Sequence, residues 1–227
     1  MSLGERSRTF RKKTKRKNAQ IKHRNKKLVS KYPWLARVSW NTGYPIRDKT
    51  YKYISLWDDL PEGWISAFGR MMCDEIQKSL EKEHLENEVY IEQAKEKYGQ
   101  LRIYMQGTSE TYNIISIYEF ISENVCYKCG RPHVPMLNMS WISPYCKKCY
   151  NKIMNRNVEK GYIKSFRPYE DCASKDKEHW RIANSITRKR FSTEGDTEVT
   201  IDISDRVKAI EDLWNKRHPN DKVGGEE

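Results

Sequence analysis

The sequence predicts an α+β fold: a small helix–hairpin–helix core that ends in a cysteine-rich finger and follows a basic N-terminal arm. Apolar residues recur at the three- and four-residue spacing of a helix in 63–84 and 109–124, and at the two-residue spacing of strands in 88–106. Two Cys-x2-Cys pairs come next, and a block of cations opens the chain. We divide the chain into the arm (1–31), an aromatic-rich segment (32–62), the core with its finger (63–158) and a C-terminal extension (159–227).

The arm holds nearly all of the excess charge of the chain, whose formal net charge is +12. Residues 1–30 contain twelve Lys or Arg and one acid, Glu5, whereas the other 197 residues contain 31 bases and 30 acids. Such a block indicates an interaction tail that neutralises nucleic-acid phosphates in a salt-sensitive way. The expected contacts are Arg6, Arg8, Arg11, Lys12, Lys13, Lys15, Arg16, Lys17, Lys22, Arg24, Lys26 and Lys27.

The arm has two other interpretations: a solubilising tail without a dedicated partner, or a segment that docks on an acidic protein surface. Its Lys, Arg, Gln and Ala residues favour helix, so we expect it to become helical when phosphate neutralises it. Deleting residues 1–30 is expected to leave the fold intact. The segment 32–62 is predicted to form short strands and loops, with its aromatic rings in a core rather than stacked on bases.

Residues 63–84 are predicted to form an amphipathic helix, with Cys73 as a small core residue. Residues 88–106 alternate as in a hairpin. Val89, Ile91 and Gln93 alternate with polar neighbours, Leu101, Ile103 and Met105 do the same, and Gly99 supplies the turn. A second helix is predicted at 109–124. Beyond 159 we predict a short strand through Val199, Ile201 and Ile203, and a helix near 205–217 with Val207, Ile210 and Trp214 on one side. In the helix predicted at 63–84, three- and four-residue spacings place Ile65, Phe68, Met72, Ile76 and Leu80 on one face.

The cysteine spacing predicts one metal site. Cys126 and Cys129 form the first pair, and Cys146 and Cys149 form the second after sixteen residues. Zinc prefers a tetrahedron of four soft or borderline ligands, which two such pairs supply with little strain. Four incidental reduced cysteines, or His133 as a substitute ligand, are the alternatives. A site closed by four thiolates leaves no position for a catalytic water, so we expect one structural Zn²⁺.

The residues around the cysteines predict a treble-clef-like finger: a knuckle at Cys129-Gly130, a short hairpin, and a second pair at a helix N-terminus. Many HNH nucleases use such a finger, with a His directly after the last pair. Tyr150 stands at that position and His133 is alone in the segment, so we expect no enzymatic activity. Arg131, Lys147, Lys148 and Lys152 would extend a basic surface beside the metal.

Residues 60–150 resemble a family of small phage and prophage zinc-finger proteins. The specific part of the resemblance is the K-E-K-aromatic-G-x-L-R-x-Y run at 95–104. Four other segments also match: Gly63-Trp64, residues 73–76, residues 126–132, and Trp141 before the second cysteine pair. It implies a phage or mobile-element origin and an α+β module that ends in a zinc finger. It carries over no activity, and it leaves out the arm and the last quarter of the chain.

Together these patterns predict a non-enzymatic, zinc-containing accessory protein that binds RNA or DNA through its arm within a nucleic-acid-containing complex. A phage inhibitor that binds a host defence, transcription or translation complex directly, and a degenerate HNH-like nuclease, are the alternative functions. No apolar segment of signal-peptide or membrane-spanning type is visible, so we expect a cytoplasmic location, in a bacterial host for a phage protein. We expect no membrane and no small-molecule substrate as partner.

Overall fold

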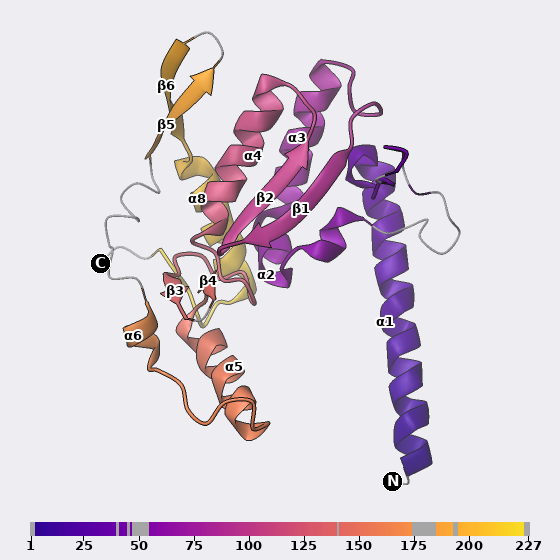
Figure 1. The fold of residues 1–227 in the computed structure, drawn as a ribbon, viewed down its shortest axis with the longest axis vertical. Helices are drawn as coiled ribbons and strands as arrows, with labels where there is room; N and C mark the ends of the chain where they lie inside the picture. The colour runs from indigo at the N-terminus through magenta and orange to yellow at the C-terminus, as the bar shows by residue number, and fades with distance from the viewer. Residues whose placement is uncertain are drawn as a thin grey trace. The chain divides into compact units, whose positions relative to one another are not determined.

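The computed structural model describes residues 3–39, 41–44, 46, 55–139, 141–173, 185–192 and 195–224. These residues form helices and two-stranded sheets, which confirms the α+β class (Figure 1). In this part of the chain, no helix combines the length and hydropathy needed to cross a bilayer. The helices are α1 (Leu3–Lys31), η1 (Pro33–Leu35), η2 (Leu56–Asp59), α2 (Glu62–Trp64), η3 (Ile65–Gly69), α3 (Arg70–Lys82), α4 (Ser109–Ser122), α5 (Lys147–Glu159), α6 (Tyr169–Cys172) and α8 (Ser204–Arg217).

The strands pair in three hairpins, β1 with β2, β3 with β4 and β5 with β6. The chain divides into two compact units, and both α3 and the β1–β2 hairpin contribute residues to each of them. The first unit comprises Met1–Asp59, Gln77–Ala94 and Ile103–Thr108, and the second comprises Leu60–Ile76, Lys95–Arg102 and Ser109–Glu227. The strands are β1 (Ile91–Lys97), β2 (Gln100–Met105), β3 (Met136–Asn138), β4 (Ile142–Pro144), β5 (Ser185–Ser192) and β6 (Gly195–Asp202).

The backbone of the basic arm forms one continuous helix, α1 (Figure 1). Its last turns bury one face: Asn25 and Leu28 are only 1% and 7% exposed. These positions are three residues apart and therefore lie on the same side of the helix. Deleting residues 1–30 would remove this buried face from the first unit, which argues against the expectation that the fold stays intact.

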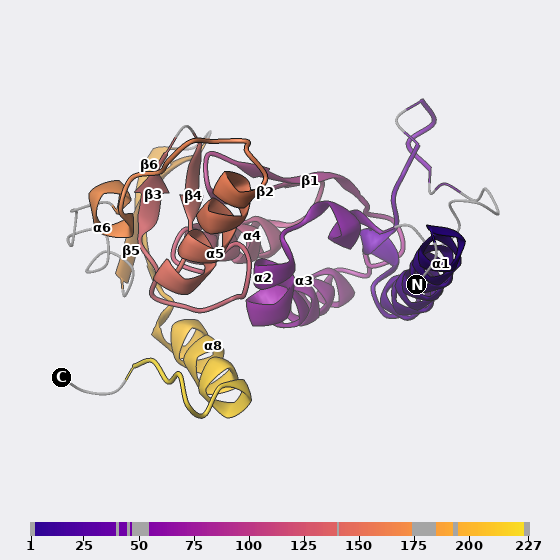
Figure 2. The same ribbon diagram turned by 90° about the horizontal axis from the view of Figure 1, so that it is seen from below.

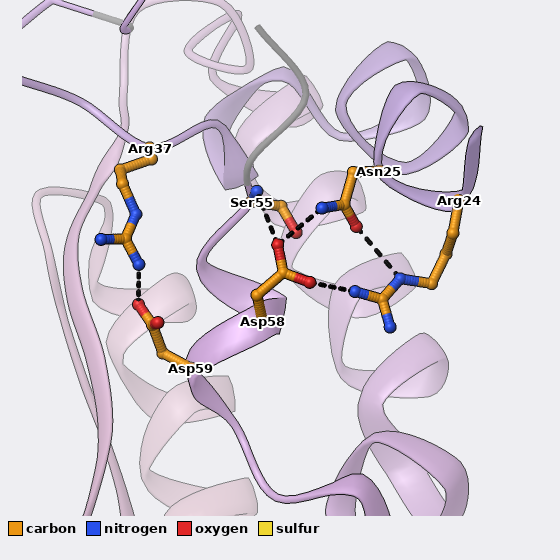
Figure 3. A network of polar contacts seen from close by, with 6 residues as sticks. All are labelled: Arg24, Asn25, Arg37, Ser55, Asp58 and Asp59. Atoms are coloured by element: carbon orange, nitrogen blue, oxygen red, sulfur yellow. Dashed lines mark hydrogen bonds and ion pairs between the residues drawn. The ribbon is translucent and has the colours of Figure 1, made fainter. Parts of the chain in front are cut away.

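A polar network ties the end of α1 to η2 (Figure 3). The amide of Asn25 donates to Asp58 Oδ2 at 2.6 Å, and Arg24 forms an ion pair with the same carboxylate. A second ion pair joins Arg37 to Asp59. Because Asn25 is buried, loss of either partner would leave a polar group without its hydrogen bond.

The aromatic segment does not form the expected strands in its described residues. These residues include η1, η2 and an isolated antiparallel bridge between Ala36 and Ser55. Trp34 and Trp57 are buried, and the Trp34 indole donates to Gln77 Oε1 at 2.8 Å. Trp34 and Trp57 thus lie in a core, as expected, whereas Tyr44 is 74% exposed. Trp40, Tyr51 and Tyr53 lie outside the described residues. At Trp34 and Trp57, core packing and turns outweigh strand propensity.

The first core helix is interrupted: α2, the π-helical turn η3 and α3 follow one another from Glu62 to Lys82. The predicted apolar stripe is buried at Phe68, Met72, Ile76 and Leu80, and Ile65 is partly buried. Cys73 is fully buried, as predicted.

The predicted hairpin turn is confirmed. Tyr98 and Gly99 have φ values of +52° and +80°, as two-residue turns between twisted strands require. The expected burial pattern holds in β2 but is wrong in β1, where Gln93 is exposed and Ala94 is buried. Burying the Gln93 amide would require hydrogen-bond partners in the core, whereas the Ala94 methyl requires none.

In the second unit, the turn end of this hairpin is bonded to α4 by a hydrogen bond and an ion pair. The backbone N–H of Leu101 donates to Ser122 Oγ at 2.8 Å, and Arg102 pairs with Glu119 at 3.0 Å. A further hydrogen bond joins α4 to α3: the Tyr118 hydroxyl donates to Glu75 at 2.6 Å.

The C-terminal helix α8 joins the same network. Arg206 donates two hydrogen bonds, of 2.9 and 2.8 Å, to the Glu75 carboxylate. Ile210 and Trp214 are buried, as the sequence predicted. The predicted strand corresponds to β6, which ends at Asp202 before Ile203; its partner β5 was not predicted.

Candidate metal centre

The first cysteine pair lies in a tight turn that follows α4. The N–H of Gly130 donates to the carbonyl of Cys126 at 3.0 Å, and the N–H of Cys126 donates to the carbonyl of Arg131 at 2.8 Å. Gly130 has φ +84°, a conformation that residues with a Cβ rarely adopt. The chain thus reverses within five residues, and this turn (126–130), called the knuckle below, brings both sulfurs to one side.

The second pair is fixed by a helix start. Cys146 is the N-cap of α5, and Cys149 lies in its first turn. The antiparallel β3–β4 hairpin precedes it and lies beside the N-terminal end of α5 in both views (Figures 1 and 2). The N–H of Tyr127 donates to the Pro144 carbonyl at 2.8 Å, so the end of β4 holds the knuckle against the second pair.

The four sulfur atoms form one cluster. All of them lie within 4.8 Å of one another, and the Sγ atoms of Cys129 and Cys146 are 3.7 Å apart. A tetrahedron with metal–sulfur bonds of about 2.3 Å has edges of about 3.8 Å. The cluster is therefore of the size that a single metal ion requires, and these four cysteines can hold one.

The thiols cannot all ionise without a cation. Hydrogen bonds from Cys129 and the other cysteines lower the pKa of Cys126, because its sulfur is the shared acceptor. The same hydrogen bonds, seen from the donors, raise the pKa of Cys129 and Cys149, and burial acts in the same direction. A bound divalent cation would replace the shared protons, so its binding would release protons and strengthen as the pH rises.

An apolar and aromatic shell surrounds the cluster. Val134 packs against Cys126 and Cys146, and Tyr145 lies beside them. Burial raises the pKa of the Tyr145 and Tyr169 hydroxyls to about 12, so both remain neutral at physiological pH. The Tyr169 hydroxyl donates to the Tyr145 carbonyl at 3.0 Å, away from the sulfurs. The shell thus adds no further charge to the cluster.

The knuckle also rests on the start of the core helix. The Trp64 indole donates to the Val125 carbonyl at 3.0 Å, and the N–H of Gly63 donates to the Tyr127 carbonyl at 3.2 Å. The Gly63-Trp64 motif of the sequence therefore serves to position the first cysteine pair.

His133 and Tyr150 lie outside the sulfur cluster among the described residues. The ring of His133 contacts Glu211 of α8 through Nε2. Tyr150 is buried, and its hydroxyl donates to the Arg167 carbonyl at 2.6 Å. At the position where HNH nucleases carry a His, this chain therefore has a packed side chain.

The predicted basic surface beside the cluster is partly engaged within the protein. Arg131 pairs with Asp221, and Lys147 pairs with Glu170. Lys148 is exposed at the start of α5. The sequence did not indicate that Asp221 would lie here, since a contact across 90 residues carries no local pattern.

The structure describes the arm's cations only in part. The side chains of Arg6, Arg8, Arg11, Lys12, Lys13, Lys15 and Lys17 lie outside the described residues, although their backbone belongs to α1. Arg16, Lys22, Lys26 and Lys27 are exposed, whereas Arg24 is held by Asp58. The arm and the cysteine cluster belong to different units.

Comparisons with protein-family models, with functionally described proteins and with solved structures found no match for this chain. The resemblance to phage and prophage proteins therefore stays a prediction.

Proposed function

We propose that this chain is a zinc-containing, nucleic-acid-binding accessory protein without enzymatic activity. The observation that carries the metal part is the cluster of four cysteine sulfurs within 4.8 Å. Thiolate ligands in a reduced protein favour zinc, and four of them leave no open coordination position for a substrate. Its role in this proposal is structural: the metal joins the knuckle to α5 and completes a treble-clef-like finger.

The charge of α1 supports the nucleic-acid part. The helix concentrates almost the entire positive excess of the chain, and Arg16, Lys22, Lys26 and Lys27 are exposed along it. A helix that presents cations at close spacing can contact successive phosphates and release their counterions. The resemblance to phage proteins leads us to place this activity in a phage-encoded factor that acts on a nucleic-acid-containing complex.

Deleting residues 1–20 tests the role of the arm. The truncation removes eight of the twelve arm cations and keeps the buried Asn25 and Leu28. We expect weaker binding to a labelled single strand. A plot of log affinity against log salt is expected to become shallower by roughly 0.7–0.9 for each phosphate that the shortened arm no longer neutralises. Fluorescence anisotropy between about 0.05 and 0.2 M salt measures both quantities.

The matched control is Lys164→Gln, which neutralises an exposed cation outside the arm and is expected to leave the slope unchanged. An unaltered slope in the truncated protein would contradict a phosphate-binding arm. Weak binding of the intact protein to free nucleic acid, combined with tight binding to a host complex, would favour the protein-directed inhibitor instead.

A further inference from the structure

A cavity of about 740 Å³ adjoins the cysteine cluster within the second unit, and Cys129, Cys146 and Cys149 form part of its wall. It is bounded by the knuckle, by the first turns of α5, and by the end of α8 with the segment that follows. Sites for small organic ligands commonly have volumes of roughly 300–1,000 Å³. The lining side chains with binding chemistry include Arg131, Lys148, Lys152, Trp214, His218 and Asp221.

The cations of this cavity converge on one internal carboxylate. Asp221 forms an ion pair with Arg131, which lowers the pKa of its carboxyl group, and Lys148 and His218 act in the same direction. The backbone fixes Asp221 in place, because its carbonyl accepts the Trp214 indole N–H at 2.6 Å and its N–H donates to the His218 carbonyl at 2.9 Å. A carboxylate held beside the cations of Arg131 and Lys148 marks a position suited to an anion.

Two lysines in the cavity keep unused binding capacity. Neither Lys148 nor Lys152 makes an ion pair with any residue in the described part of the chain, and both are exposed. They are four residues apart on α5, so they project from the same face of that helix. Together with Arg131 they can contact a phosphate group from two sides.

Planar groups form another part of the wall. The rings of Trp214 and His218 are stacked, with centroids 3.7 Å apart and an interplanar angle of 21°. The Arg131 guanidinium lies 5.9 Å from the Trp214 ring centroid. A nucleobase stacks readily on aromatic rings and on guanidinium groups. Trp214 is itself buried, so the partly exposed His218 ring that stacks on it is the aromatic surface of this wall that a flat ring can contact.

We propose that this cavity binds a nucleotide unit, one phosphate with its base, and that Asp221 occupies the phosphate position in the free protein. Lys148, Lys152 and Arg131 bind the phosphate, and the base lies against the His218 and Trp214 side. The inference rests on the proposed function, because the nucleotide unit is most simply part of the bound strand. A free mononucleotide has the same chemistry and is distinguished by experiment.

Isothermal titration of the full-length, zinc-loaded protein with adenosine 5′-monophosphate tests the site. Lys148→Gln combined with Lys152→Gln is expected to weaken binding about tenfold, because each lysine contributes a charge-assisted contact. Asp221→Asn is expected to strengthen binding by roughly fivefold, since it removes the competing charge and keeps the side-chain shape. Lys164→Gln is the control and is expected to have no effect.

Titration with an eight-nucleotide strand, run on the same variants, distinguishes the sources. Parallel changes for strand and monophosphate assign the site to bound nucleic acid, and changes for the monophosphate alone assign it to a free nucleotide. Inorganic phosphate is expected to bind more weakly than the monophosphate, because it lacks the stacking ring.

Absence of saturable binding, or unchanged affinity in both variants, would overturn the proposal. The double lysine variant could instead lose zinc affinity while its nucleotide affinity stays the same, and this result would also overturn the proposal. The lysines would then serve only to balance the net charge of about −2 that a zinc ion with four thiolates carries. If the double lysine variant fails to fold, Asp221→Asn decides alone. The arm truncation affects strand binding independently, so failure of either proposal can be recognised separately.

Discussion

Replacing Cys126 by serine is expected to abolish stoichiometric metal binding and to unfold the finger around it. Cys126 is fully buried, and its sulfur is the acceptor for the neighbouring thiols and for the N–H of Cys146 at 3.4 Å. A structural zinc site in a small finger provides folding free energy of about 10 kcal/mol or more, because the site does not exist in the unfolded chain. Loss of one of four ligands removes most of that contribution.

Circular dichroism during thermal unfolding, with and without a strong chelator, measures this effect. The variant is expected to resemble the chelated native protein. Cys73→Ala is the matched control: Cys73 is equally buried but lies outside the cluster, so its replacement is expected to leave the metal bound and to cost about 1–2 kcal/mol. A Cys126→Ser protein that keeps its metal and its native unfolding temperature would refute the assignment of this ligand.

The second large effect is expected from Gly63→Ala. A Cβ at this position would lie 2.1 Å from the Cys126 carbonyl oxygen and 2.7 Å from that of Tyr127. Both contacts are with backbone atoms, which cannot turn aside as a flexible side chain can. We expect the zinc-loaded protein to lose about 3 kcal/mol or more in its free energy of unfolding, because the core helix start and the knuckle must separate.

Urea denaturation of zinc-loaded protein measures the loss. Gly161→Ala is the matched control: Gly161 has φ +70°, but nothing lies within 4 Å of an added Cβ. Its cost is therefore backbone strain alone, about 1 kcal/mol. If the two variants were equally stable, close backbone packing at Gly63 would not be the reason for glycine there.

The site could be predicted from the sequence because its determinants are local. The pairs Cys126/Cys129 and Cys146/Cys149 each span a single turn, and their spacing alone indicated that four sulfurs would meet. Gly99 and Gly130 were identified for the same reason, since a tight reversal of the chain needs a residue that tolerates positive φ. Apolar periodicity located α3, α4 and α8, the β1–β2 hairpin and β6.

The remaining features depend on contacts between distant segments. Gly63 looks like an ordinary helix-start residue until the knuckle, more than sixty residues later, packs on it. The pairing of Arg131 with Asp221 brings the end of α8 to the finger, and no pattern in either segment indicates it. Trp34 and Trp57 suggested strands, but packing in the first unit placed them in and around short 3₁₀ helices.

The central claim is that the four cysteine sulfurs coordinate a single zinc ion. Elemental analysis of the purified, folded protein by inductively coupled plasma mass spectrometry, with protein concentration determined independently, tests it most directly. We expect one zinc per chain and no other transition metal in comparable amount. Folded protein that contains no bound metal would contradict the account.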